Sequence, residues 1–182
     1  MASVAMVRKV YFDTDCLSSF YWVEKFDILQ ALYQGRIVIP ESVAHEISKV
    51  PYLKEEHKRN LDDNLITVDS LTVYDRITRD YYNELTSIDP KMGSGEAEAL
   101  LLAKQNQGIL ASNNLRDISR YVKLFDMQHL TTPRILMKAE QQNIITRNDC
   151  DTIWVKMLER RIKLPYQTYE EYRDKKNKNK TY

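Results

Sequence analysis

The sequence is 182 residues long and 43% hydrophobic, and its 27 Lys and Arg residues nearly balance its 26 Asp and Glu residues. This length supports one sizeable core and is short for two independent domains, so we expect one domain with appendages. The charge balance gives no reason by itself to expect nucleic-acid binding, and any polyanion site must come from local clusters or from bound cations.

Two further classes are excluded by simple counts. Cys16 and Cys150 lack the spacing of a zinc cluster or of a dense disulfide framework, and we expect both to remain reduced thiols. The apolar start is too short for a signal peptide, and no apolar run approaches the roughly 18 residues that a membrane span needs. We therefore expect a cytoplasmic protein without a membrane segment.

The first half of the chain alternates strand and helix patterns. We expect a strand over residues 10–13, a single helix over 16–33, a strand over 36–40, a helix over 41–50 that Pro51 ends, a polar surface helix over 54–64, a strand ending near Asp69, and a helix over 75–85.

The second half continues the alternation. The patterns predict a helix over 96–107, a strand over 108–112, a helix over 115–124, a strand over 128–130, two helices over 133–142 and 148–160, and a basic tail. Strands separated by helices indicate a three-layer α/β/α fold with a mostly parallel central sheet. Asp13 and residues 112–117 then meet at the carboxyl edge of that sheet, where ligands bind in such folds.

Acidic side chains stand at several of these junctions. Asp13 ends an apolar strand, so we expect it to meet a cation or to sit at an exposed strand tip, and helix capping suits Thr14 or Asp15 better. Glu96 and Glu98 lie about 200° apart around a helix, and Glu96 shares the apolar stripe and should face inward. Gly93 and Gly95 should let the backbone bend tightly just before Glu96.

Other acids have simpler readings when taken alone. Glu46 lies on a helix surface and Asp117 in a first helical turn, where acids are ordinary residues. Clustered oxygen ligands suit Mg²⁺ or Mn²⁺, whereas the three histidines are scattered and form no zinc set. His45 is best explained as an exposed helix residue.

Four segments together carry a family resemblance: YFDTDCL, IPESVAHEI, GSGEAEALLLA and LASNNLRDI. In this order they resemble the acidic motifs of a PIN domain, the fold of VapC-type toxin ribonucleases. The GEAEA form and the later TPRILMKAEQQNIIT are similar to a PIN-like branch that ends in an extra helical pair. The resemblance covers Arg8 to Leu164, and it implies a nuclease core over 1–131 and a helical pair packed on it over 132–164. From its basic composition we expect residues 165–182 to form a flexible tail.

The resemblance also implies the site residues. The catalytic quartet would be Asp13, Glu46, Glu96 and Asp117, with Asp13, Glu96 and Asp117 as ligands of Mg²⁺ or Mn²⁺, and the auxiliary residues would be Asp15, Glu98, Ser112 and Asn114. Asp15 departs from the family pattern because a small polar residue is common there. The Asn113–Asn114 turn also departs from the family pattern, since many members carry an aspartate in this turn. The fourth acidic residue of the site therefore has to be Asp117.

The resemblance implies a metal-dependent endoribonuclease with RNA as its substrate. It also implies that the protein is the toxin of a toxin–antitoxin pair and is neutralised by a small antitoxin. A homodimer is a further possible assembly. Two alternatives stay open. The segment FDTDCL also resembles a haloacid-dehalogenase-like phosphatase, in which Asp13 attacks phosphate and Asp15 moves a proton. The Asn113–Asn114 turn suits a PIN-like module that no longer cuts and only binds RNA or assembles.

Two groups of residues outside the motifs bear on RNA binding. The tail RDKKNKNK reads most simply as a solvated end, or it assists RNA binding through phosphate contacts. The second group consists of five tyrosines: Tyr81, Tyr82, Tyr166, Tyr169 and Tyr172. Tyrosines at helical spacing are usually half-buried packing residues, and the alternative is that these side chains stack on bases or cover an interface.

Overall fold

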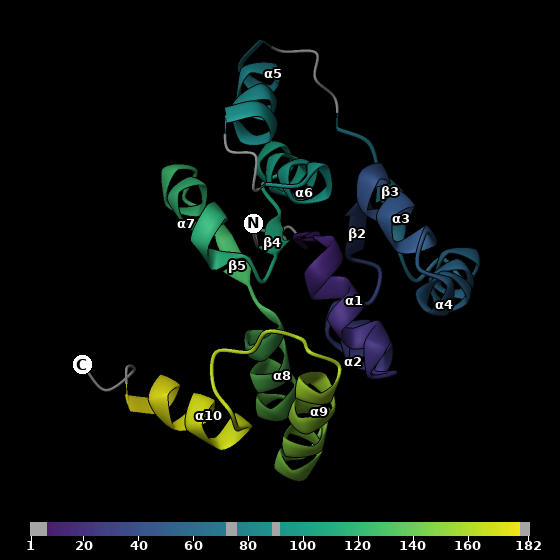
Figure 1. Ribbon diagram of the computed structural model, residues 1–182, viewed down its shortest axis with the longest axis vertical. Coiled ribbons are helices and arrows are strands. Elements are labelled where there is room, and N and C mark those ends of the chain that lie inside the picture. Colours follow the sequence, from purple (N-terminus) through teal and green to yellow (C-terminus); the bar gives the residue numbers. More distant parts are fainter. Residues whose placement is uncertain (1–6, 72–75, 89–91, 179–182) are drawn as a thin grey trace, which may run out of the picture.

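A computed structural model describes residues 7–71, 76–88 and 92–178 (Figure 1). Its centre is a five-stranded sheet in the order β3-β2-β1-β4-β5, and every neighbouring pair is parallel. The strands are β1 (Val10–Phe12), β2 (Ile37–Pro40), β3 (Thr67–Asp69), β4 (Ile109–Ala111) and β5 (Gln128–Leu130).

Helices connect and cover the strands on both faces. They are α1 (Thr14–Trp22), α2 (Phe26–Tyr33), α3 (Glu41–Ser48), α4 (Pro51–Asp62), α5 (Arg76–Asn83), α6 (Ser94–Gln105), α7 (Leu115–Leu124), α8 (Thr132–Gln141), α9 (Arg147–Glu159) and α10 (Tyr169–Lys178), with a π-helical turn at Glu84–Ile88 after α5. This arrangement confirms the three-layer α/β/α fold and the mostly parallel sheet.

The alternation of side chains along the strands builds two cores. Val10, Phe12 and Ile39 pack into a cluster with α1, α2, α8 and α9. Tyr11 and Val38 face the opposite way and pack against α6 and α7. Because residues of one strand point to alternate faces, these short buried strands separate the two helical layers.

The predicted helix over 16–33 is wrong in one respect, because the structure breaks it into α1 and α2. Glu24 has a φ of 57°, its N–H donates to the Tyr21 carbonyl at 3.0 Å, and the Lys25 N–H donates to the Phe20 carbonyl at 2.9 Å. This is the Schellman pattern that ends helices, usually with glycine in the left-handed position. Because a glutamate occupies this position, the sequence gives no signal of the break.

Pro51 also differs from its predicted role. The sequence predicts that Pro51 ends the preceding helix, whereas in the structure it begins α4.

The C-terminal extension differs from the flexible tail that the sequence predicts. Residues 169–178 form α10, and the buried rings of Tyr169 and Tyr172 lie 5.7 and 5.6 Å from the Trp154 ring of α9. The Tyr169 hydroxyl also donates to Glu140 of α8 at 2.6 Å. Thus α8, α9 and α10 pack as one unit at the lower end of the view in Figure 1. The charged residues of α10 conceal its short apolar face in the sequence.

Two further features of the structure concern the cysteines and the lengths of the helices. Cys16 and Cys150 are both buried and free. No helix in the part of the chain that the structure describes is long and apolar enough to cross a bilayer.

Candidate functional site

Asp13 lies directly after β1, at the carboxyl edge of the sheet. Its backbone N–H donates to the Ala111 carbonyl at 3.0 Å, which fixes it beside the end of β4. The side chain caps α1, because Oδ1 accepts the Cys16 N–H at 2.7 Å, and the Ser112 hydroxyl also donates to the carboxylate. The expectation of an exposed strand tip is therefore wrong: Asp13 is 3% exposed, and it is the helix cap itself.

Glu46 approaches the same place from α3. The hydroxyl of Thr14 donates to its Oε2. On its other side lies Gly95 of α6, where a Cβ atom would stand 3.1 Å from Oε1 of Glu46 and 3.0 Å from Cγ2 of Val43. Gly95 sits inside a helix with ordinary φ, so its role is the close approach of α3 and α6, and the tight bend predicted for it is absent.

Glu96 follows in the first turn of α6 and points toward the carboxyl edge of the sheet, as helical geometry predicts. Asn114 donates from Nδ2 to its Oε2 at 3.2 Å. The other oxygen, Oε1, is buried and has no hydrogen-bond partner among the described residues. A buried acceptor without a donor is unfavourable, so this oxygen is available to a ligand.

Asp117 is connected to Glu96 through a single amide. Asn114 Nδ2 donates to Asp117 Oδ2 at 2.7 Å as well as to Glu96, so one side chain holds both carboxylates. Asn114 itself is fixed by its backbone N–H, which donates to the Ser112 hydroxyl at 3.2 Å. Asp117 stands on the far side of this amide and borders a neighbouring cavity.

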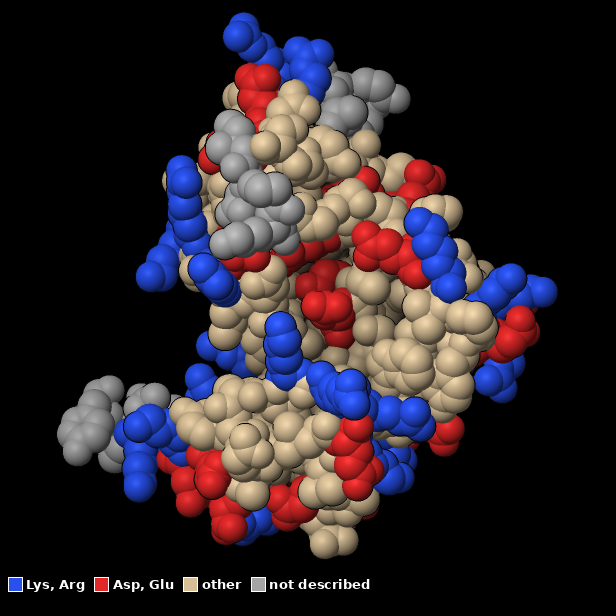
Figure 2. Space-filling model, viewed as in Figure 1, with Lys and Arg blue, Asp and Glu red and all other residues tan. Residues whose placement is uncertain are grey.

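A cavity of about 210 Å³ brings together Asp13, Glu46 and Glu96, and Asp117 is not among its described lining residues. The cavity is lined by Asp13, Thr14, Asp15, Glu46, Gly93, Glu96 and Asn114. These described lining residues include no Lys or Arg. Figure 2 shows acidic side chains gathered in a hollow near the centre of this face, with a band of basic side chains along one rim.

Burial and mutual repulsion perturb two of these acids. Burial, followed by the charges of Asp15 and Glu46, raises the pKa of Asp13 to about 7, against the hydrogen bonds from Ser112 and Cys16. Burial, then the charge of Asp13, raises the pKa of Glu96 to about 8. Asp15, the departure from the family pattern, thus adds negative potential at the mouth of the cavity. Perturbed carboxyl groups gathered in a cavity are typical of functional sites.

The donor set suits a hard divalent cation, because every charged group around the cavity is a carboxylate oxygen. The unpaired Oε1 of Glu96 and the raised pKa values both indicate that a cation would offset charges that the protein leaves uncompensated. Within residues 7–71, 76–88 and 92–178, no three Asp, Glu, His or Cys side chains already converge as a closed ligand set. Binding an ion would therefore require the carboxylates to move closer together.

Other residues singled out by the sequence lie outside the cavity. Glu98 accepts a hydrogen bond from Ser42 at 2.6 Å and so links α6 to α3. Asn113 bonds through both amide atoms to Thr132, each at 2.9 Å, which ties the β4–α7 turn to the start of α8. His45 is exposed on α3.

The sequence analysis does not include Thr14 among the site residues, and it includes Asn114 only as an auxiliary residue. The sequence suggests only helix capping for Thr14, yet its hydroxyl holds Glu46, and its position next to Asp13 is the signal that points to the site. The double role of Asn114 gave no signal, because it depends on how α6 and α7 pack.

Comparison with known proteins agrees with this arrangement. A family model described as a PIN domain matches residues 9–178. No curated protein matches the chain. The match extends beyond Leu164, where the resemblance seen in the sequence ended, and includes α10. The chain therefore belongs to the PIN-domain family, whose members are in general nucleases.

Proposed function

We propose that the chain is a divalent-cation-dependent endoribonuclease, with Asp13, Glu46, Glu96 and Asp117 as its acidic centre. The observation that carries this proposal is the buried, unpaired Oε1 of Glu96 in a cavity that holds Asp13 and lacks a basic partner among its described lining residues. Membership of a nuclease family supports the same conclusion.

Asp13 and Glu96 are the first ligands in this proposal, and Asp117 is the third. Hydrogen bonds from Cys16 and Ser112 restrict the orientation of the Asp13 carboxylate. Asn114 orients Glu96 and Asp117 together, in the way that outer hydrogen bonds position metal ligands. When bound, Mg²⁺ or Mn²⁺ supplies the Lewis acidity that activates water and stabilises charge on a phosphodiester.

Glu46 completes the centre from the opposite wall. Thr14 holds one of its oxygens, and the close approach at Gly95 keeps the carboxylate at the cavity. An endonuclease must admit a strand without a free end, and the acidic hollow faces the molecular surface in Figure 2. The resemblance to toxin ribonucleases supports RNA as the substrate.

Cleavage of a single-stranded RNA in Mg²⁺ or Mn²⁺ tests the proposal. We expect internal cleavage that stops when the cation is chelated and that falls by at least about 100-fold in Asp13→Asn, because a ligand matters no less than the residues that orient it. Asparagine still accepts the Cys16 N–H, so α1 keeps its cap. Cleavage that survives in Asp13→Asn would show that the centre lies elsewhere.

The toxin role forms the second part of the proposal, and the resemblance to VapC-type toxins supports it. A toxin of this kind would act in the cytoplasm and be neutralised by a small antitoxin. Induced expression should stop growth, a neighbouring reading frame encoding a small DNA-binding-type protein should restore it, and Asp13→Asn should be harmless. A homodimer belongs to the same proposal and is tested by sedimentation.

The alternatives have less support. A phosphatase of the haloacid-dehalogenase type needs a lysine near Asp13, and the described lining residues include none. An aspartyl-phosphate trapped on Asp13 would support the phosphatase alternative. A non-cutting module is motivated by the Asn113–Asn114 turn, but Asn114 holds two carboxylates in place. Calorimetric binding of Mn²⁺ that is lost in Glu96→Gln would argue against this module.

A further inference from the structure

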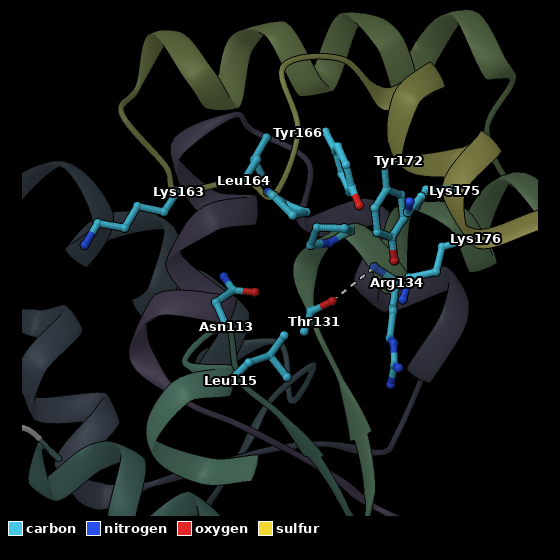
Figure 3. Close-up of a pocket in the computed structure, with 12 residues that line it drawn as sticks. Asn113, Leu115, Thr131, Arg134, Lys163, Leu164, Tyr166, Tyr172, Lys175 and Lys176 are labelled. Carbon is cyan, nitrogen blue, oxygen red and sulfur yellow. Dashed lines mark hydrogen bonds between the residues drawn. The ribbon is translucent and has the colours of Figure 1, made fainter. Parts of the chain in front are cut away.

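A second cavity, of about 430 Å³, lies between the β4–α7 turn, the start of α8 and the segment that leads into α10. Its size falls within the range of roughly 300–1,000 Å³ that is usual for ligand pockets. Figure 3 shows residues of both the sheet edge and the C-terminal extension around it. We call it the extension pocket.

The charge of the extension pocket is opposite to that of the acidic cavity. Arg134, Lys163, Lys175 and Lys176 line it, and no Asp or Glu is among its described lining residues. None of these four cations forms an ion pair with a described residue, whereas Arg173 on the same helix as Lys175 is paired with Glu140. A concave surface with unpaired cations attracts an anionic ligand.

The same pocket carries an aromatic wall. The rings of Tyr166 and Tyr172 lie 6.2 Å apart, and Leu164 and Pro165 extend the apolar surface beside them. Tyr172 is 3% exposed, and its buried hydroxyl has no hydrogen-bond partner among the described residues. In Figure 3 this hydroxyl points into the pocket on the side of Arg134. A ligand with acceptor oxygens would satisfy it.

A third cavity, of about 570 Å³, borders both the extension pocket and the acidic cavity. It shares Asn113 and Lys163 with the extension pocket, and Asp15 and Asn114 with the acidic cavity. Its wall adds three further cations: Arg116, Arg160 and Arg161. The third cavity is also lined by Asp15 and Asp117, so both acidic and basic side chains stand between the acidic centre and the extension pocket.

We propose that the extension pocket binds one nucleotide of the single-stranded RNA that is cleaved at the acidic centre. Its base would pack against Tyr166 and Leu164, and its phosphate would lie on Lys175 and Lys176. This rests on the proposed endoribonuclease function and deepens it, because it makes the C-terminal extension part of the substrate site. The cations that have no carboxylate partner, and the third cavity that borders both sites, favour a nucleic acid over a protein segment as the occupant.

RNA affinity measured by fluorescence anisotropy over a series of salt concentrations tests the pocket. All variants carry Glu96→Gln so that the RNA is not cut. Lys175→Ala with Lys176→Ala should weaken binding and reduce the salt slope by about 0.7 for each lost phosphate contact. The control pair Lys54→Ala with Lys58→Ala removes the same charge from exposed positions of α4, on another side of the molecule (Figure 1), and should leave the affinity unchanged.

The aromatic wall is tested separately. Tyr166→Ala should weaken binding by at least about fivefold without changing the salt slope, and Tyr166→Phe should retain the affinity. The backbone carbonyl of Tyr166, which accepts from the Trp154 indole at 3.2 Å, is kept in both variants.

The outcomes separate the pocket from the proposed function. Unchanged RNA affinity in both the lysine double variant and Tyr166→Ala would refute RNA binding in the extension pocket and would favour a protein segment as its occupant. Cleavage by the chain with Glu96 intact is measured in parallel. RNA cleavage without any effect of the pocket variants would refute the pocket alone, and RNA bound through the pocket but never cut would refute the nuclease alone.

Discussion

Gly95 of α6 lies directly against Glu46 of α3, so close that a Cβ atom at position 95 would stand 3.1 Å from Oε1 of the carboxylate. The packing of two helices thereby determines where one acid of the centre points. Position 93, two residues earlier, has open space around the corresponding Cβ atom. This contrast supplies a matched pair of variants.

Gly95→Ala should lower RNA cleavage by several-fold to about 100-fold, because small displacements of a catalytic group are costly. The free energy of unfolding should change little, since alanine favours the helix by up to about 1 kcal/mol while the contact with Val43 and Glu46 opposes it. Gly93 lines the acidic cavity, but a Cβ atom there meets open space, so Gly93→Ala should lower cleavage much less than Gly95→Ala. Equal activity of the two variants, measured at matched stability, would refute a positioning role for Gly95.

Asn114→Ala should reduce cleavage by about 10- to 100-fold, because it releases both Glu96 and Asp117. Asn113→Ala is the comparison: it removes two bonds to Thr132 and should cost about 1–3 kcal/mol of stability with a smaller effect on the chemistry. Cleavage rates and urea denaturation of both variants check this division. Asn114→Ala with full activity would contradict the bridging role.

Stability of the cation-free protein should depend on pH in a defined direction. Folding raises the pKa of Asp13 to about 7 and that of Glu96 to about 8, so the folded chain binds these protons more tightly than the unfolded chain. The free energy of unfolding should therefore fall as pH rises from about 4 to about 8, by at most about 1.4 kcal/mol per pH unit for each group.

Urea denaturation in a chelator at pH 5 and at pH 8 measures this slope. The free energy of unfolding of Asp13→Asn should depend less on pH than that of the wild type, so the variant should gain stability relative to the wild type at pH 8. Added Mn²⁺ should stabilise the wild type most at the higher pH. Identical slopes in the wild type and Asp13→Asn would mean that burial does not perturb Asp13 as described.

Removal of residues 165–182 should destabilise the protein. It takes away the buried rings of Tyr169 and Tyr172 and uncovers Trp154, a loss of at least about 3 kcal/mol. A chain of this size should then melt roughly 6–12 °C lower. Calorimetry of the shortened chain checks this prediction. An unchanged melting temperature would contradict the packing of α10 and favour the flexible tail that the sequence alone suggests.

Much of the fold follows from patterns within the sequence. The short apolar runs at β1, β2 and β4 and the helical stripes between them predict a parallel sheet, and the inward face of Glu96 follows from helical geometry. The break at Glu24 does not, because a glutamate occupies a position usually given to glycine. Nor does α10, whose two buried tyrosines are surrounded by charged residues.

The site shows the same division. The positions of Asp13 and Glu96 are predictable, because Asp13 follows a strand and Glu96 lies in the first turn of a helix at the carboxyl edge of the sheet. The roles of Gly95 and Asn114 depend on contacts between helices that are distant in sequence, so no local pattern reveals them. The extension pocket likewise exists only because residues 163–176 pack back against the β4–α7 turn.

Glu96 and Glu98 provide the most direct test of the acidic centre, because they are two residues apart on α6 and only Glu96 lines the cavity. The measurement is Mn²⁺-dependent cleavage of a single-stranded RNA by Glu96→Gln and Glu98→Gln. We predict that Glu96→Gln loses cleavage by at least about 100-fold, whereas Glu98→Gln stays near the wild-type rate. Efficient cleavage by Glu96→Gln, or an equal loss in both variants, would contradict the account.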